Sequence, residues 1–127
     1  MLKVINDKPF NRLFCLMTES TNFASLKSTI HQIAEENVNR VLDGQSYKGD
    51  QIKSWSEDII RGILSKLSAE QFQPFKYLAN CLVLSKRSNG VHTVTMSLWD
   101  PQNDGSDTLQ WSNDSMQCIV TVWGLKY

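Results

Sequence analysis

Apolar residues recur along the chain with two different periods, helical in the first half and alternating in the second. From residue 23 they return at spacings of three and four as far as Gly44, and a second such stripe follows Asp50. This spacing buries one side of each segment, so it predicts two amphipathic helices, the first ended by Gly44 and the second capped by Asp50. The expected core stripes are Leu26, Ile30, Ile33, Ala34, Val38, Val41 and Leu42, then Ile52, Trp55, Ile59, Ile63 and Leu67.

Four short segments with alternating side chains follow, separated by turn signals such as Ser88-Asn89-Gly90. Residues 75–86 and 116–125 are apolar on both sides, whereas residues 91–100 and 107–112 are mixed or apolar on one side. Strands that are apolar on both faces belong inside a sheet, and short connections make sequential strands pair. The pattern predicts an α+β fold with a four-stranded antiparallel sheet in the order third, fourth, first, second, so that residues 91–100 and 107–112 lie at the edges.

Two helices on one face of this sheet would leave its other face uncovered. The first and fourth strands are apolar on that face as well, and an exposed apolar patch of several hundred Å² usually marks an interface. We therefore expect a homodimer in which two sheets pack against each other. The 127 residues suit one domain, which we place at residues 23–127, after a partly ordered N-terminal extension at residues 1–22.

The composition gives little support for other classes of protein. Lysine and arginine number 13, as do aspartate and glutamate, so no broad basic field exists to attract nucleic acid. No apolar run approaches the roughly 20 residues of a membrane span, and we expect neither membrane insertion nor a signal peptide. Cys15, Cys81 and Cys118 have no metal-binding spacing and read as small apolar residues of a reducing compartment.

Candidate chemistry is equally sparse. His31 and His92 have no cysteine or carboxylate at ligand spacing, and no nucleophile motif or phosphate-binding glycine loop occurs. Residues 100–105 resemble the start of a calcium loop, but Trp111 stands where the bidentate glutamate is required. We therefore expect no enzyme activity, no metal and no cofactor.

Trp99, Trp111 and Trp123 on one sheet leave nucleic-acid binding by base stacking as an alternative. The neutral chain and the absence of an aromatic RNA-recognition signature favour core or interface positions for these side chains instead.

The second alternating segment, residues 91–100, has an unusual composition for an edge strand. It contains no lysine and no proline, although natural edge strands usually carry such protection. An unprotected edge can bind an extended peptide as an additional strand, with backbone hydrogen bonds supplying the affinity. The alternatives are that a loop, the N-terminal extension or the second protomer covers this edge.

Three segments resemble the Tctex-type dynein light chains. They are PFKYLANCLVL at residues 74–84, GVHTVTMSLWDPQNDGSDTLQW at residues 90–111 and MQCIVTVWGL at residues 116–125, with Trp55 as a further match. The resemblance implies a non-enzymatic homodimer, or a heterodimer with a paralogous light chain, in which residues 91–100 are exchanged between protomers. It also implies that the free edge of the exchanged strand, with the second helix, binds the dynein intermediate chain or a cargo protein.

The same resemblance assigns roles to individual positions. Thr93, Thr95 and Ser97 are expected to contact the peptide, and Leu98 and Trp99 to shape the end of its groove. The residues expected to hold the dimer are Leu82, Val94, Met96 and Val120. A motor-independent cargo adaptor or scaffold remains the alternative function.

The implied location is the cytoplasm and cytoskeleton, with the cilium left open. Two departures from the family pattern, the extension at residues 1–22 and Trp123 where phenylalanine is expected, leave the cytoplasmic or axonemal subgroup undecided.

Overall fold

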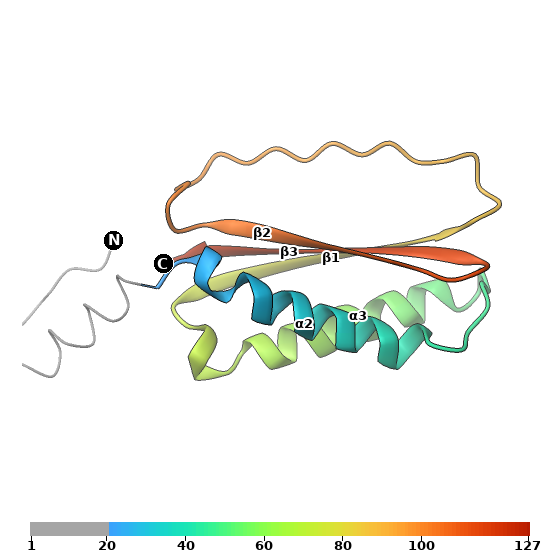
Figure 1. Ribbon diagram of the computed structural model, residues 1–127, viewed down its shortest axis with the longest axis horizontal. Coiled ribbons are helices and arrows are strands. Elements are labelled where there is room, and N and C mark those ends of the chain that lie inside the picture. Colours follow the sequence, from blue (N-terminus) through green and yellow to red (C-terminus); the bar gives the residue numbers. More distant parts are fainter. Residues whose placement is uncertain (1–20) are drawn as a thin grey trace, which may run out of the picture.

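Two helices cover one face of a three-stranded antiparallel sheet in the computed structural model, which describes residues 21–127 (Figure 1). The expected extension at residues 1–22 therefore lies almost wholly outside the described residues. In chain order the elements are α2 (Phe23–Leu42), α3 (Ile52–Leu67), the short 3-10 helix η1 (Glu70–Phe72), β1 (Phe75–Ser85), β2 (Gly105–Ser112) and β3 (Met116–Lys126).

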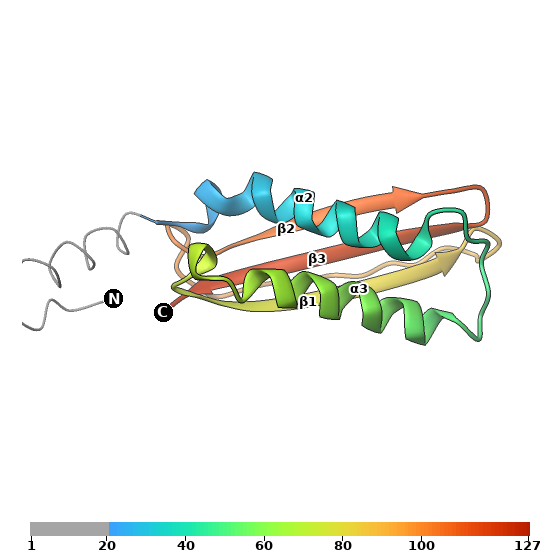
Figure 2. The same ribbon diagram turned by 90° about the horizontal axis from the view of Figure 1, so that it is seen from below.

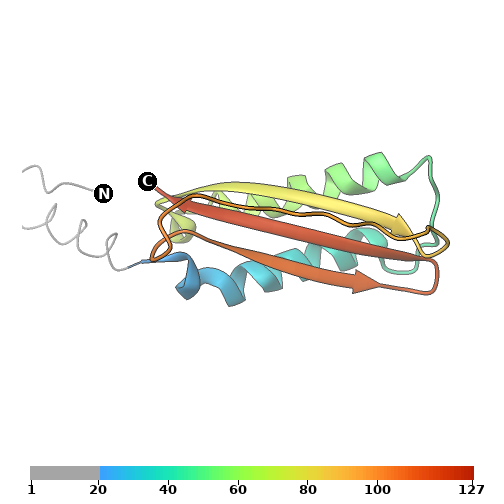
Figure 3. The same ribbon diagram turned by 90° about the horizontal axis from the view of Figure 1, so that it is seen from above.

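The strands lie in the order β1-β3-β2, which confirms the predicted order for three of the four segments. β3 is central, and its residue Val120 pairs with Cys81 of β1 on one side and Leu109 of β2 on the other. The fourth predicted strand, residues 91–100, is not part of this sheet. Residues 86–99, which we call the arch, instead run the length of the sheet over the face opposite the helices (Figures 1 and 3).

The helix boundaries follow local signals, only some of which were predicted. Asn22 caps α2 because its Oδ1 accepts a hydrogen bond from the Ser25 backbone N–H at 3.0 Å. Just after the end of α2, Gly44 has a φ of 76°, in agreement with its predicted role as a stop. The prediction that Asp50 caps α3 is wrong, because the capping position is Gln51 and no side chain bonds the helix end there.

The core lies between the helices and the sheet. α2 packs over β2 and α3 over β1, side by side along the strands (Figure 2). The predicted stripes are confirmed, since Leu26, Val41, Ile52 and Trp55 pack against the core and the other stripe residues are buried. The buried apolar side chains are Phe23, Ile30, Ile33, Ala34, Val38, Leu42, Ile59, Ile63, Leu67, Phe72, Phe75, Val83, Leu109, Met116, Cys118, Val120 and Val122.

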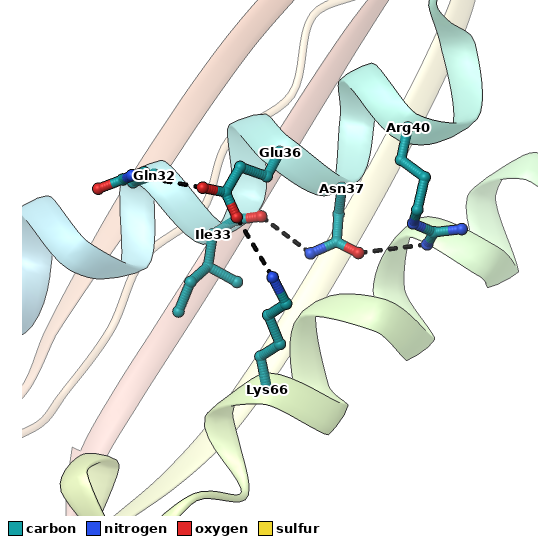
Figure 4. Close-up of polar contacts among 6 residues, drawn as sticks. All are labelled: Gln32, Ile33, Glu36, Asn37, Arg40 and Lys66. Carbon is teal, nitrogen blue, oxygen red and sulfur yellow. Dashed lines mark hydrogen bonds and ion pairs between the residues drawn. The ribbon is translucent and has the colours of Figure 1, made fainter.

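The contact between the helices contains a buried polar side chain, Asn37, which is 4% exposed. Its Nδ2 donates to the Ile33 carbonyl at 2.9 Å, and its Oδ1 accepts from Arg40 Nη2 at 3.2 Å (Figure 4). The Arg40 guanidinium also donates to the Asp58 carbonyl of α3. Gly62 of α3 faces this group so closely that a Cβ there would overlap Asn37 Oδ1. The glycine therefore permits the close approach of the two helices.

Replacing Gly62 with alanine should lower the free energy of unfolding by about 1 kcal/mol. Overpacking costs about 1–3 kcal/mol, and the gain in helix propensity of about 1 kcal/mol offsets only part of this cost in the middle of the range. Urea denaturation at fixed protein concentration measures the difference. Gly49→Ala is the matched control, because a Cβ at that loop position meets nothing within 4 Å. Equal stability of Gly62→Ala and wild type would show that the two helices do not need a glycine at this contact.

Candidate strand-addition site

The arch presents large apolar side chains to solvent. Val94, Met96 and Leu98 are 68%, 88% and 104% exposed. Thr93, Thr95 and Ser97, which alternate with them, are exposed as well. Burying a side chain such as leucine or methionine contributes about 1.5–3 kcal/mol, so a folded chain rarely leaves three in one segment in water. This segment therefore has the alternating composition of a strand, but no sheet covers its apolar side chains.

The sheet face beneath the arch, which we call the open face, is apolar on one half only. β1 contributes Leu78, which is 60% exposed, with the half-buried Leu82 and Leu84. β3 contributes Ile119, Trp123 and Leu125, all partly exposed. β2 is polar on this face, where it carries Ser106, Thr108, Gln110 and Ser112. A partner that buries apolar surface would thus bind over β1 and β3.

Within the described residues, β1 pairs with β3 only, so its second edge has no strand beside it. β1 has 11 residues and spans about 37 Å at the usual rise per residue. The ten residues 91–100 would span about 34 Å when extended. The unpaired edge and the exposed segment therefore match in length.

The arch ends in a turn fastened to the rest of the fold, residues 100–105, which we call the return turn. Asp104 Oδ1 accepts from the backbone N–H of Lys126 at 2.7 Å, and Asp104 Oδ2 accepts from that of Asp100 at 2.9 Å. The Asn103 carbonyl accepts from the Phe23 N–H at 2.9 Å. Gly105 and Gly124, which pair across β2 and β3, lie against the Phe23 ring. The end of β3 and the start of α2 thus fix this turn.

The position of the return turn explains why residues 91–100 do not join their own sheet. Asp100 is held close to the end of the central strand β3, by way of Asp104. The outer edge of β1 lies two strand spacings away, or about 10 Å. To pair there, the chain would have to pass over the end of β1 just before Asp100, but the return turn holds Asp100 near the end of β3. The free edge of β1 is therefore open to a strand from another molecule.

Electrostatic features of the described residues are local and structural. Hydrogen bonds from Asn103 and the Gln102 N–H hold the pKa of the Asp100 carboxyl below its ordinary value. His31 Nδ1 lies 2.7 Å from Asp107 Oδ2 and links α2 to β2. From residue 21 onward, no group of three or more His, Cys, Asp or Glu side chains is placed to hold a metal ion.

The predicted site residues fall in two places. The predicted groove residues Thr93, Thr95, Ser97, Leu98 and Trp99 all lie on the arch, where only Trp99 is half-buried. Of the residues expected to hold the dimer, Val94 and Met96 lie on the arch and Leu82 on the open face.

Val120 is 1% exposed and belongs to the core beneath the helices, so its side chain is not available to a partner. The return turn was singled out in the sequence only as a turn signal and as a segment that resembles the start of a calcium loop. Its aspartates, spaced four apart, were the signal that the two ends of the turn bond each other.

The three tryptophans expected on the sheet do not form one stacking surface. Trp111 donates its Nε1–H to Asn39 Oδ1 at 2.9 Å and packs against the core. Trp99 belongs to the arch, and Trp123 alternates onto the open face. This arrangement does not favour nucleic-acid binding through stacked bases.

Comparisons with known proteins identify relatives over most of the chain. The Tctex-1 family model matches residues 25–125. "Dynein light chain Tctex-type" of Dictyostelium discoideum is 39% identical over 94 residues, or 74% of this chain and 85% of the relative. "Dynein light chain Tctex-type 3" of Homo sapiens is 35% identical over 95 residues, or 75% and 81%. The Drosophila melanogaster "Dynein light chain Tctex-type" is 31% identical over 96 residues, or 76% and 86%.

No helix between residues 21 and 127 is long and apolar enough to cross a bilayer.

Acid should loosen the return turn by protonating Asp100. Because the folded-state pKa lies below the unfolded value of 3.8, the stabilisation is present above pH 3.8 and is lost as the pH falls through the folded value. In an NMR titration, the Gln102 and Asn103 amide resonances should shift with a midpoint below 3.8. Asn103→Ala should raise that midpoint, and Asp100→Asn should abolish the transition. A wild-type midpoint at or above 3.8 would contradict this role.

Proposed function

Because the chain belongs to the Tctex-1 family, we propose that it is a non-catalytic light chain of a dynein motor complex, which binds an extended segment of the intermediate chain by strand addition. The names of the relatives support the motor assignment, since those described above are dynein light chains. The observation that carries the binding mode is the combination of an exposed strand-like arch and an unpaired β1 edge in one molecule.

The first step of the proposed mechanism is reciprocal strand exchange between two copies. Residues 91–100 of each protomer pair with the free edge of β1 in the other, which completes a four-stranded sheet on both sides. The exchange places Val94 and Met96 at the interface and covers the apolar half of the open face, including Leu82. The matching lengths of the two segments and the fixed return turn support this step.

The second step uses the exchanged strand as a docking edge. Pairing with β1 occupies one edge of the strand and leaves its other edge, along Thr93, Thr95 and Ser97, to an incoming peptide, with Leu98 and Trp99 at the end of the groove. Four to six backbone hydrogen bonds at about 0.5–1.5 kcal/mol each, plus some apolar burial and less the ordering of the peptide, suggest micromolar affinity. Cargo segments of the same extended form would compete for this groove.

The first test of the exchange introduces a charged side chain on the arch and measures the mass of the protein by sedimentation. Wild-type protein should sediment at twice the mass of one chain, and Met96→Asp should sediment as a monomer, because exchange would bury the new carboxylate. The monomer should retain its circular dichroism, since Met96 is 88% exposed in the unexchanged chain. Tyr47→Asp is the matched control, as it places the same charge at another exposed apolar residue away from the arch. A monomeric wild type would reject the exchange.

The second test removes a backbone donor from the proposed groove. Thr95→Pro lacks the N–H at the centre of the arch and should weaken binding of an intermediate-chain peptide at least 10-fold, through the lost bond and the distorted strand. Thr95→Ala keeps that N–H and should bind within a few-fold of wild type. Calorimetry measures affinity, and sedimentation of the same samples reports whether the dimer persists. Equal affinities for Thr95→Pro and Thr95→Ala would exclude backbone pairing at this position.

A further inference from the structure

Cys81 and Cys118 form a close thiol pair across the two strands β1 and β3. Their Sγ atoms are 3.7 Å apart, and both side chains lie on the helix-facing side of the sheet. In the strand register, Cys81 pairs with Val120, so Cys118 is its diagonal neighbour two residues away. Diagonal neighbours in an antiparallel pair are usually about 7–8 Å apart, a distance that mainly long side chains bridge, yet the two Sγ atoms here are only 3.7 Å apart. The sheet therefore brings together two thiols that are 37 residues apart in sequence.

The two thiols have different environments. Cys118 is fully buried, whereas Cys81 is half-buried and lies under α3, close to Ser56. A hydrogen bond from Cys118, supplemented by one from Ser56, holds the pKa of Cys81 below its ordinary value. The same interaction with Cys81, together with burial, raises the pKa of Cys118. Because the thiolate is the nucleophile in cysteine chemistry, Cys81 is placed to react first and Cys118 second.

We propose that Cys81 and Cys118 are a peroxide-sensitive pair that forms a reversible intramolecular disulfide, joining β1 to the central strand β3. In a disulfide the sulfur atoms are about 2.05 Å apart and the Cα atoms at most about 6.8 Å apart. The two Sγ atoms must therefore approach each other by less than 2 Å, and a small shift of β1 against β3 accompanies the bond where the diagonal spacing exceeds that limit. The bond would close a loop that contains the arch, the return turn and β2, and it would hold β1 beside the strand from which the rest of the sheet extends.

The reaction balances with hydrogen peroxide as the oxidant. The Cys81 thiolate attacks one peroxide oxygen, the O–O bond breaks, and the departing hydroxide takes up a proton to form water. Cys81 is thereby oxidised to a sulfenic acid. Cys118 then attacks the Cys81 sulfur as its thiol loses a proton, the S–O bond breaks, and a second water leaves. Two thiols and one peroxide thus give one disulfide and two water molecules, and a thiol reductant such as glutathione reverses the change.

Mass spectrometry of the native full-length protein in a Cys15→Ser background tests the proposal, because only the pair then remains. Hydrogen peroxide should remove the mass of two hydrogen atoms, proteolysis should yield a peptide linked through Cys81 and Cys118, and dithiothreitol should restore both thiols. In Cys118→Ser, Cys81 should stop at the sulfenic acid and be labelled by dimedone. In Cys81→Ser, Cys118 should stay unmodified because it is buried.

The same oxidation in urea shows whether the folded geometry drives the reaction. The native protein should form the bond at least 10-fold faster than the unfolded chain, in which the two cysteines meet only by loop closure. The proposal is overturned if native protein does not react, if it gives sulfinic or sulfonic acid at Cys81 without the disulfide, or if the unfolded chain reacts as fast. It is likewise overturned if the only product links two chains.

Discussion

The carboxylate of Asp104 is the constraint on which the topology depends. One of its oxygens bonds the backbone at the end of β3 and the other bonds the backbone of Asp100, so the return turn is tied to the centre of the sheet. Charge-assisted hydrogen bonds of this kind are about twice as strong as neutral ones. A chain held there can enter β2 directly, but it cannot lie along the far side of β1. A segment with the alternation of a strand is thereby separated from the nearest edge in its own molecule.

The rest of the fold makes this separation possible by fixing both the sheet end and the helices. Phe23 packs on the Gly105 and Gly124 pair, where side chains would leave no room for its ring, and its N–H donates to the return turn. At the other contact, Gly62 allows α3 to approach Asn37 of α2. The three glycines thus permit close packing. Gly105 and Gly124 bring the start of α2 against β2 and β3, and Gly62 brings α3 against α2.

Much of this architecture could be predicted because its signals are local. The stripe that contains Ile30 and Val38, and the one that contains Ile59 and Ile63, record a helical period directly. The apolar residues on both sides of residues 75–86 and 116–125 predict that these two segments are neighbours inside the sheet. The predicted capping role of Asp50 was wrong by one position. The capping position is Gln51, so Asp50 lies one residue before it. Val120 was placed at the interface because β3 is apolar on both faces, and alternation alone cannot tell which face the helices cover.

The candidate site was harder to predict for a different reason. The alternation in residues 91–100 predicts a strand, but periodicity contains no information about which molecule supplies the neighbouring strand. That depends on where the two ends of the arch are anchored, and the anchor at Asp104 involves Lys126, 22 residues further along the chain. The sequence signal for this anchor is the spacing of Asp100 and Asp104, which does not reveal that Asp104 also bonds the backbone of Lys126.

If the docking edge exists only after exchange, then peptide binding and dimer formation are linked equilibria. A peptide that binds the exchanged strand and not the isolated arch stabilises the dimer by RT ln(1 + [L]/Kd) for each site, or about 2.7 kcal/mol at 100 times the dissociation constant. A two-fold dimer has two such edges, so a partner that is itself dimeric gains from a high effective concentration at the second site. In such an assembly modest affinity per site would be sufficient, because a peptide bound to the outer edge of the exchanged strand also favours the exchange that creates this edge.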